Sequence, residues 1–485
     1  MFWSVMRRNP NISALLLIVF AGLISSCDAP VRIGVAQARA AGINVTTMPQ
    51  PGYQQPGHQF APTGPAPSPP ASGSGLIFLP SVPQPHAPDD VVGALLQRDG
   101  PYAGPSPVTF GQVFVPGQLS AKSGLAAIVD GHEVPAQLDV KTTNDDGSVR
   151  FGVVTLVSAV PAKMMLVKRP MPIGGAVDLA GLQGRYDLAV DIVLHGESGD
   201  TPRHFDVAAL LSRALAAGKV SYWLRGPLAT EARVDVPVES SLHLTFDIRG
   251  YADGSTLTDV QFNNDIAMQP VGGTLNYDVT ITQHGKPVFQ QTAVQHFHYQ
   301  TWHRKIWSDG DPNVNVVHDV AAMERAGAIW NYDLHIGVPR QGVAHEQSLS
   351  IDASYTAILN NAGITKYMPM TGGRGDIGPL PIWDAVWLET QDADAARYSL
   401  VQADAAGSVP WHLFDSKTGT YVTTDQYPTL WDDGRAGPNG ITALTQQEDG
   451  KDGWAVDPAH EPGLSYLAYL ETGTRYYLDQ LDAQA

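Results

Sequence analysis

The sequence has a single cysteine, Cys27, and no basic run longer than two residues. One cysteine excludes an intramolecular disulfide framework, and no spacing of His or Cys matches a zinc motif. Nucleic-acid binding depends on clustered Lys and Arg, so the net charge of −18 argues against a nucleic-acid partner. The apolar stretch over residues 12–25 is too short to span a bilayer comfortably. What is left is an acidic globular chain, and its 485 residues are enough for about three domains.

The first 26 residues resemble the signal peptide of a bacterial lipoprotein. Arg7 and Arg8 form a positive segment before the short apolar stretch. Ile24-Ser25-Ser26-Cys27 resembles a lipobox, in which the cysteine is diacylated and becomes the mature N-terminus. An ordinary secretory signal with an incidental cysteine is the alternative. Both interpretations predict an exported protein of the bacterial cell envelope. The first predicts a periplasmic or surface-exposed protein that meets the membrane only through the lipid on Cys27.

Composition then divides the chain into four regions. Residues 27–98 are rich in Pro, Gly and Ser, which predicts an extended tether that cannot bury a core. Short apolar runs separated by turns such as Asp130-Gly131 predict a small β-barrel over residues 99–178. Longer strand-like runs over residues 179–315 predict a β-sandwich. From residue 316 the pattern becomes helical.

A repeat of about 80 residues organises the helical region. In both copies an Asp precedes a Pro by the same spacing (Asp376 and Asp457), an apolar helix ends in Leu-Glu-Thr, and a second helix follows. That second helix carries Arg-Tyr-x-Leu-x-Gln-x-Asp-Ala or a close variant, starting at Arg397 and Arg475. The first helix of each pair is apolar nearly all round, which predicts burial on every side. The two αα-hairpins predict an α/α toroid over residues 316–485, with too few helices for a closed ring.

Several segments resemble the exo-rhamnogalacturonan lyase-like proteins. They are "PVTFGQVFVPG", "VPAQLDVKTTNDDGSVRFGVVTL", "YWLRGPLATEARV", "TGGRGDIGPLPIW" and "DPAHEPGLSYLAYLETG". The resemblance covers the chain from about Pro101 to the end and implies a RIFT-like barrel, a central β-sandwich and a C-terminal α/α toroid. It also implies a polysaccharide lyase that cleaves an acidic, rhamnogalacturonan-like glycan.

The segment "WAVDPAHEPGLSYLAYLETG" carries the first candidate site. Pro462 fits the first position of a helix, so His460 would face the positive end of the helix dipole and stay neutral, as a general base requires. Asp457 would orient it, and Tyr466, a further catalytic candidate, would face the bowl of the toroid. The alternative is a capped helix start in which His460 has only a structural role. Replacement of an exposed His460 is expected to change stability little.

The loop "TGGRGDIGPLP" carries the second candidate site. Arg374 could hold a substrate carboxylate with two hydrogen bonds, and Asp376 would contact the sugar. The alternative is an Arg374–Asp376 ion pair that locks the loop. Further candidates in the helical region are His412 for catalysis and, for sugar contacts, three tryptophans and one tyrosine: Trp411, Trp383, Trp431 and Tyr332. Each tryptophan could equally belong to the core.

Three functions remain open. A lyase needs a residue that neutralises the uronate carboxylate, a base for the C5 proton and a donor for the leaving oxygen. A glycoside hydrolase would use two carboxylates, Asp376 and Asp457. A surface protein that binds glycans without cleaving them needs only the aromatic bowl. The sequence implies no cofactor, although calcium held by loop carboxylates stays open.

Overall fold

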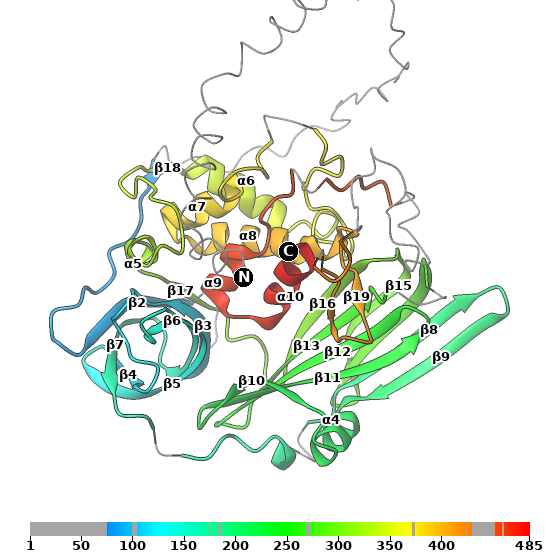
Figure 1. Cartoon of the computed structure of the whole chain (residues 1–485), viewed down its shortest axis with the longest axis horizontal. Coiled ribbons are helices and arrows are strands. Elements are labelled where there is room, and N and C mark those ends of the chain that lie inside the picture. Colours follow the sequence, from blue (N-terminus) through cyan, green and yellow to red (C-terminus); the bar gives the residue numbers. More distant parts are fainter. Residues whose placement is uncertain are drawn as a thin grey trace, which may run out of the picture. The chain divides into compact units, whose positions relative to one another are not determined.

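The computed structural model describes residues 75–98, 104–172, 174–182, 186–267, 272–370, 374–423, 425–428, 452–457 and 460–485. Cys27, the signal segment, most of the tether and Trp431 lie outside the described residues. The described chain is rich in β structure, with helices concentrated toward the C-terminus (Figure 1). No helix among the described residues is long and apolar enough to cross a membrane.

The first β region is a nearly closed seven-stranded sheet (Figure 1). Its strand order is β17-β2-β7-β4-β5-β6-β3. The strands span β2 (Asp90–Arg98), β3 (Ser106–Val113), β4 (Gly124–Val129), β5 (His132–Thr143), β6 (Val149–Ser158), β7 (Ala162–Arg169) and β17 (Val314–Val317). Asp130 (φ 46°) and Gly131 (φ 86°) form the predicted tight turn, because a two-residue hairpin of this type requires positive φ at both positions.

Two boundaries of this region differ from the prediction. Strand β2 lies inside the segment assigned to the tether, because its apolar residues pack in the barrel core although Pro-rich sequence precedes them. Strand β17 follows the sandwich in the chain yet pairs with β2, with Val317 opposite Leu95. The barrel is therefore completed by a segment from beyond the sandwich.

The second β region is a sandwich of two antiparallel sheets. One sheet has the order β10-β11-β12-β13-β16 and the other β15-β14-β8-β9. The first contains β10 (Ser221–Arg225), β11 (Ala229–Glu239), β12 (Leu242–Tyr251), β13 (Thr256–Asn264) and β16 (Gln300–Trp307). The second contains β8 (Ala189–Gly196), β9 (Gly199–Asp206), β14 (Leu275–Gln283) and β15 (Lys286–His296). Apolar residues of both sheets form one core, closed at one end by helix α4 (Val207–Ala216). The order of barrel, sandwich and helices is as predicted.

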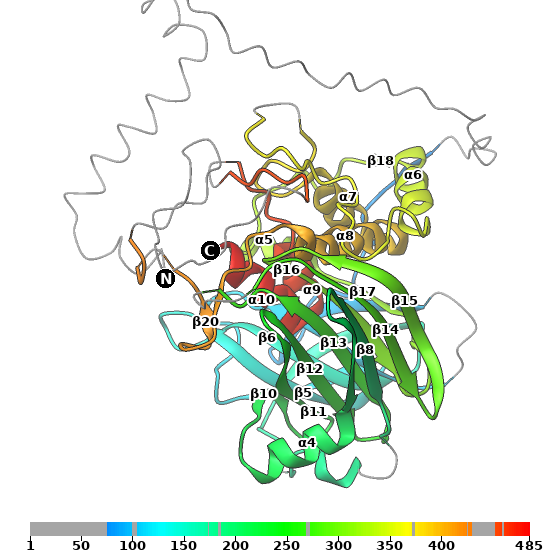
Figure 2. The same ribbon diagram turned by 90° about the vertical axis from the view of Figure 1, so that its right-hand side faces the viewer.

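The outer face of the five-stranded sheet is polar and yet buried. Successive outward residues on β11, β12 and β13 include Arg233, Asp247 and Asp259. Helices α8 and α10 cover this face and pair with it (Figure 2): Asp479 of α10 accepts a hydrogen bond from Arg233, and Asp404 of α8 accepts one from His303. This polar layer joins the sandwich to the helical region.

The helical region contains α5 (Val320–Arg325), α6 (Arg340–Ser350), α7 (Ile382–Thr390), α8 (Ala393–Ala405), α9 (Tyr466–Thr472) and α10 (Arg475–Gln484). Helices α7–α8 and α9–α10 form the two predicted αα-hairpins, each turning at a residue with positive φ, Gln391 and Gly473. A Cβ at Gly473 would lie 2.7 Å from Val153 of the barrel, so this turn needs glycine for its close approach as well. The described helices form a layer against the two β regions, and the toroid stays a prediction.

Short elements connect these parts. Strand β1 (Leu76–Ile77) pairs with β18 (Val338–Pro339), and β19 (Phe414–Asp415) pairs with β20 (Thr420–Tyr421). The described residues also form the 3₁₀ turns η1 (Ala180–Leu182) and η2 (Ala406–Ser408). The β1–β18 pair ties the C-terminal part of the segment assigned to the tether to the loop between α5 and α6, which contributes to the candidate site.

Candidate functional site

The loops that precede α7 and α9 lie side by side. Tyr367 and Ala455 form an isolated parallel bridge, and the backbone N–H of Met368 donates to the carbonyl of Ala455 at 3.0 Å. The ammonium group of Lys366 donates to the carbonyl of Asp452 at 2.9 Å. The two repeats thus bring their leading loops together, as the repeated motif predicts.

Arg374 joins these loops through a buried guanidinium group. Its Nε donates to Oδ1 of Asp376 at 2.9 Å, Nη1 to the carbonyl of Met368 at 2.7 Å, and Nη2 to the carbonyl of His460 at 2.8 Å. The other carboxylate oxygen of Asp376 accepts from the backbone N–H of Thr365 at 3.1 Å. Both side chains are only 1% exposed. This geometry favours the ion pair that locks the loop over the predicted contacts of Arg374 and Asp376 with substrate.

His460 and Asp457 form a hydrogen-bonded pair beside Arg374. Nδ1 of His460 lies 2.6 Å from Oδ2 of Asp457. An ionised carboxylate only accepts hydrogen bonds, so Nδ1 carries the proton and the lone pair of a neutral ring is on Nε2. The Asp457 side chain is 1% exposed and that of His460 is 27% exposed. A buried carboxylate thus orients a partly exposed imidazole, which is the arrangement of a general base and its orienting group.

The position of His460 relative to the helix differs from the prediction. Helix α9 begins at Tyr466, so Pro462 is not its first residue and His460 belongs to the preceding loop. The tight turn after Pro462, in which the N–H of Leu464 donates to the carbonyl of Pro462, delays the helix. Asp457, and not the end of a helix, therefore orients the imidazole.

A cavity of about 450 Å³ meets this cluster at Arg374, and neither His460 nor Asp457 is among its lining residues. Its lining includes Arg374, the loop before α7, and three consecutive residues between α5 and α6: Trp330, Asn331 and Tyr332. Trp330 is 69% exposed, while Tyr332 is half-buried. Burial raises the pKa of Tyr332, helped by the charges of Asp384 and Glu389, so its hydroxyl keeps its proton at neutral pH. The cavity combines an aromatic surface with an amide and a phenol.

Tyr466 forms a hydrogen bond to the chain segment just before this lining. Its hydroxyl donates to the carbonyl of Ala328 at 2.7 Å, just before the segment that carries Trp330. The side chain is partly buried against the core around Leu388 and Leu467. Tyr466 therefore positions the Trp330 loop, whereas the sequence had suggested that it acts in catalysis.

Three other candidates lie in the interior. His412 is fully buried, with Nδ1 near the carbonyls of Tyr299 and Val409 and Nε2 2.7 Å from the side-chain oxygen of Gln480. Trp411 and Trp383 are 3% and 6% exposed and belong to one apolar cluster. A polysaccharide cannot reach these side chains, so we reinterpret His412 as a structural residue and both tryptophans as core.

Sequence reasoning named Asn331 among residues that could line the bowl but did not select Trp330. The available signal was an aromatic residue within the polar loop "AIWNYDLH", which is also consistent with an extended core segment. Among the described residues, no group of three His, Cys, Asp or Glu side chains is placed to hold a metal ion.

Comparison of the chain with models of known protein families gives no match, and comparison with curated proteins gives none either. The resemblance to exo-rhamnogalacturonan lyase-like proteins therefore rests on the quoted motifs and the order of the domains. The geometry of the Asp457–His460 pair and its neighbouring cavity carries the functional argument.

Proposed function

We propose that the protein acts on an acidic polysaccharide as a lyase, with His460 as the base. The observation that carries this proposal is the 2.6 Å hydrogen bond between buried Asp457 and partly exposed His460. The carbonyl of His460 is held by Arg374, which lines an open cavity together with an exposed tryptophan. Ligand sites combine concave apolar surface with a few polar groups, which describes this cavity. Its neighbour Arg374 holds the carbonyl of His460, so the base is fixed relative to the cavity wall.

The reaction would be a β-elimination on a uronic acid unit. Nε2 of His460 takes the C5 proton, the freed electron pair forms the C4–C5 double bond, and the C4–O bond breaks. The leaving oxygen takes a proton from the hydroxyl of Tyr332, whose raised pKa keeps it protonated. The side-chain amide of Asn331 donates to the uronate carboxylate, a role that Arg374 cannot fill while its guanidinium is bonded to Asp376 and two carbonyls.

The same geometry disfavours a hydrolase that uses Asp376 and Asp457. A glycosidase needs two carboxyl groups that flank the scissile bond. Here both side chains are buried and bonded, one to Arg374 and the other to His460. Neither carboxyl is placed to reach a glycosidic oxygen.

A glycan-binding protein without catalysis is the second candidate. The exposed indole of Trp330 favours it, because an aromatic face in an open cavity can stack on a sugar whether or not cleavage follows. The two candidates share the cavity and differ only in the role of His460.

We also propose that the protein works outside the cytoplasm, held to a membrane by lipid on Cys27, with polysaccharide as its partner and no nucleic acid. The support is the basic segment, the short apolar stretch and the Ile-Ser-Ser-Cys run of the sequence. Radiolabelled palmitate should enter the full-length protein in bacteria and should not enter Cys27→Ala. Equal labelling of both would contradict the lipid anchor.

A panel of pectic and bacterial polysaccharides tests the enzymatic proposal. The full-length protein is incubated with each, and the ultraviolet absorbance of the unsaturated product is followed. Rising absorbance that His460→Ala abolishes supports the lyase. Release of reducing ends without absorbance would favour hydrolysis, and retention of a glycan with neither signal would favour a binding protein.

A further inference from the structure

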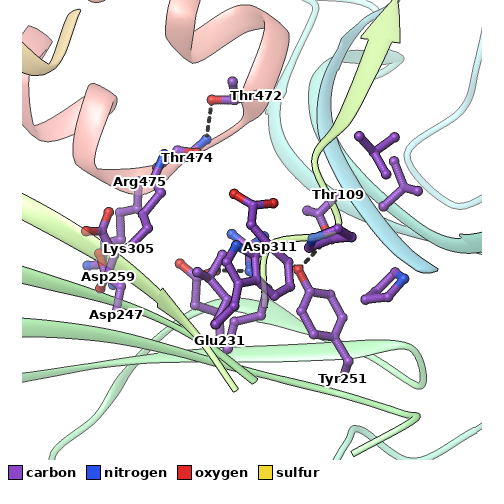
Figure 3. A pocket seen from close by; sticks show the side chains of 17 residues that line it. Thr109, Glu231, Asp247, Tyr251, Asp259, Lys305, Asp311, Thr472, Thr474 and Arg475 are labelled. Atoms are coloured by element: carbon purple, nitrogen blue, oxygen red, sulfur yellow. Dashed lines mark hydrogen bonds and ion pairs between the residues drawn. The ribbon is translucent and has the colours of Figure 1, made fainter. Parts of the chain in front are cut away.

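A second cavity, of about 190 Å³, lies where the barrel, the five-stranded sheet and the α9–α10 turn meet (Figure 3). Strand β3 contributes Thr109, the sheet contributes charged side chains, and the turn contributes Thr474 and Arg475. Two exposed residues of the lining, Lys305 and Asp311, mark its opening to solvent. None of the groups assigned to the His460 site lines this cavity.

The floor of the cavity is a row of opposite charges on neighbouring strands. Glu231 lies opposite Arg249 in the β11–β12 register, and Asp259 lies opposite Lys305 in the β13–β16 register. Nε of Arg249 donates to Glu231. The first pair is therefore satisfied within the protein. No such hydrogen bond or ion pair joins Asp259 to Lys305 in the described part of the chain.

Asp259 lines this cavity and carries an unused acceptor oxygen. Its Oδ1 lies 2.7 Å from Nδ1 of His303, while its Oδ2 is buried and has no hydrogen-bond partner among the described residues. The side chain is 7% exposed. Buried carboxylate oxygens are normally hydrogen-bonded, because the loss of hydration is otherwise uncompensated. The free oxygen of Asp259 calls for a donor supplied by a bound molecule.

Two donors face the same space. The ammonium group of Lys305 lies 5.1 Å from the ring centre of Tyr477, and Lys305 forms no ion pair with the side chains that the structure describes. The guanidinium of Arg475 donates two hydrogen bonds to Ser221, at 3.2 Å to the carbonyl and 3.0 Å to Oγ. Within the described residues it donates to no other residue. Figure 3 shows Lys305, Asp259 and Arg475 on the same side of the cavity.

An apolar surface completes the lining. The rings of Tyr251 and Trp307 stack with centroids 5.9 Å apart and planes 4° apart, and both residues line the cavity. Aromatic faces and edges of this kind pack against aliphatic C–H groups. A ligand that fits the site therefore has hydroxyl or other polar groups on one side and C–H groups on another.

The cationic side chains and the unpaired carboxylate oxygen of this cavity favour some classes of ligand over others. A cationic ligand would meet Arg249, Lys305 and Arg475, and a simple anion would meet the unpaired oxygen of Asp259. A hydroxyl group donates one hydrogen bond and accepts others, so neighbouring hydroxyls can bond a carboxylate and a cation together. Typical small-molecule pockets are about 300–1,000 Å³, so this smaller cavity suits one ring. We propose that it binds a single pyranose unit through adjacent hydroxyls held by Asp259, Lys305 and Arg475.

Titration of the full-length protein with D-galactose, L-rhamnose and D-galacturonate tests the proposal by calorimetry or ligand-observed NMR. At least one sugar should bind saturably. Lys305→Met should raise its Kd at least about tenfold, since a charge-assisted hydrogen bond is lost. Asp259→Asn should also raise the Kd. If that variant does not fold, the Kd of Lys305→Met, a substitution at an exposed residue, tests the proposal by itself. A preference for D-galacturonate over D-galactose would assign the carboxylate to Lys305 and Arg475 and supports the same site.

A matched variant controls the experiment. Lys286→Met removes an exposed lysine from strand β15, outside the cavity, and should leave sugar binding unchanged. Absence of saturable binding for all three sugars would overturn the proposal. So would equal affinity in wild type and Lys305→Met, or equally tight, Lys305-dependent binding of acetate alone.

Discussion

Nη2 of Arg374 lies 2.8 Å from the carbonyl oxygen of His460, so the buried ion pair of the first repeat fixes the base candidate of the second. The two residues are far apart in sequence and lie at equivalent loops of the two αα-hairpins. One loop supplies the clamp, and the other carries the proposed base. The two residues lie at different positions of the repeated motif, Arg374 before its Asp and His460 after it.

Arg374→Met should destabilise the protein strongly. The variant would leave Asp376 as a buried carboxylate without its cation, a change that typically costs about 3–5 kcal/mol. Chemical denaturation of both proteins measures the loss. Arg203→Met removes one partner of an exposed ion pair with Glu239 and serves as the control, with little expected change. Equal, small effects of both substitutions would show that the Arg374 clamp does not hold the loops.

Trp330→Ala should weaken glycan binding without unfolding the protein. The indole is 69% exposed, so its removal affects few internal contacts. Loss of an aromatic stacking partner is expected to cost about 0.5–1.5 kcal/mol of binding free energy. Trp330→Phe keeps a ring and should retain most of the affinity. Affinity electrophoresis in gels that contain the polysaccharide identified in the panel makes the comparison. If the polysaccharide retards Trp330→Ala as much as the wild type, Trp330 does not belong to the site.

Tyr466→Phe should lose the hydrogen bond to Ala328 and loosen the loop that carries Trp330. A neutral hydrogen bond contributes about 0.5–1.5 kcal/mol to stability. Because Tyr466 positions a binding surface, the variant should raise KM more than it lowers kcat. A large fall in kcat with unchanged KM would instead assign Tyr466 to the chemical step.

Stability should fall with rising pH through the titration of His303. Burial lowers the pKa of this histidine, but the carboxylates of Asp259 and Asp404 outweigh that effect and raise it from 6.5 to about 9. A raised pKa gives stability that is fully present below pH 6.5 and is lost as pH rises through about 9.

His303→Gln removes this titration. The free energy of unfolding of the wild type minus that of the variant should shrink steadily as the pH rises from 6.5 to about 9. Taking the difference cancels other groups that titrate there, such as Lys141, whose pKa burial lowers to about 8. A difference that stays constant with pH would contradict the ion pairs drawn for His303.

Local signals in the sequence predict much of the fold. The Asp130-Gly131 turn, the two sheets of the sandwich and both αα-hairpins follow from turn chemistry, alternation and the repeated motif. Strand β17 could not be assigned, because four residues carry little periodic signal and their partner lies in β2, across the whole sandwich. The start of α9 was also misplaced, since a proline can precede a turn as easily as a helix.

Burial explains why the candidate site was only partly predicted. His460 and Asp457 were chosen together and lie together, because their spacing fits one loop. His412 and Trp411 look equally suitable in the sequence and yet lie in the core. Alternating charges such as Glu231 and Arg233 read as a solvated face of a sheet, and only the tertiary structure shows that helices cover it.

The role of His460 can be compared directly with that of a matched histidine. His243 also pairs with a buried carboxylate, with Nε2 2.8 Å from Oδ1 of Asp265, but it lies on strand β12 of the sandwich. Either substitution by alanine removes a partner from a buried carboxylate and should cost about 1–3 kcal/mol of stability. For His460 this corrects the small change expected from the sequence, because the structure shows its bond to buried Asp457.

The decisive measurement is turnover per folded molecule, compared between the wild type, His460→Ala and His243→Ala. The substrate is the polysaccharide that the panel identifies, and the temperature is kept below the lowest melting temperature of the three proteins. Removal of a general base lowers turnover by about 10²–10⁴-fold. We predict at least a hundredfold loss for His460→Ala, at the low end of that range, and wild-type turnover for His243→Ala. Wild-type turnover in folded His460→Ala would contradict the proposal and make the Asp457–His460 pair a structural feature of the loop.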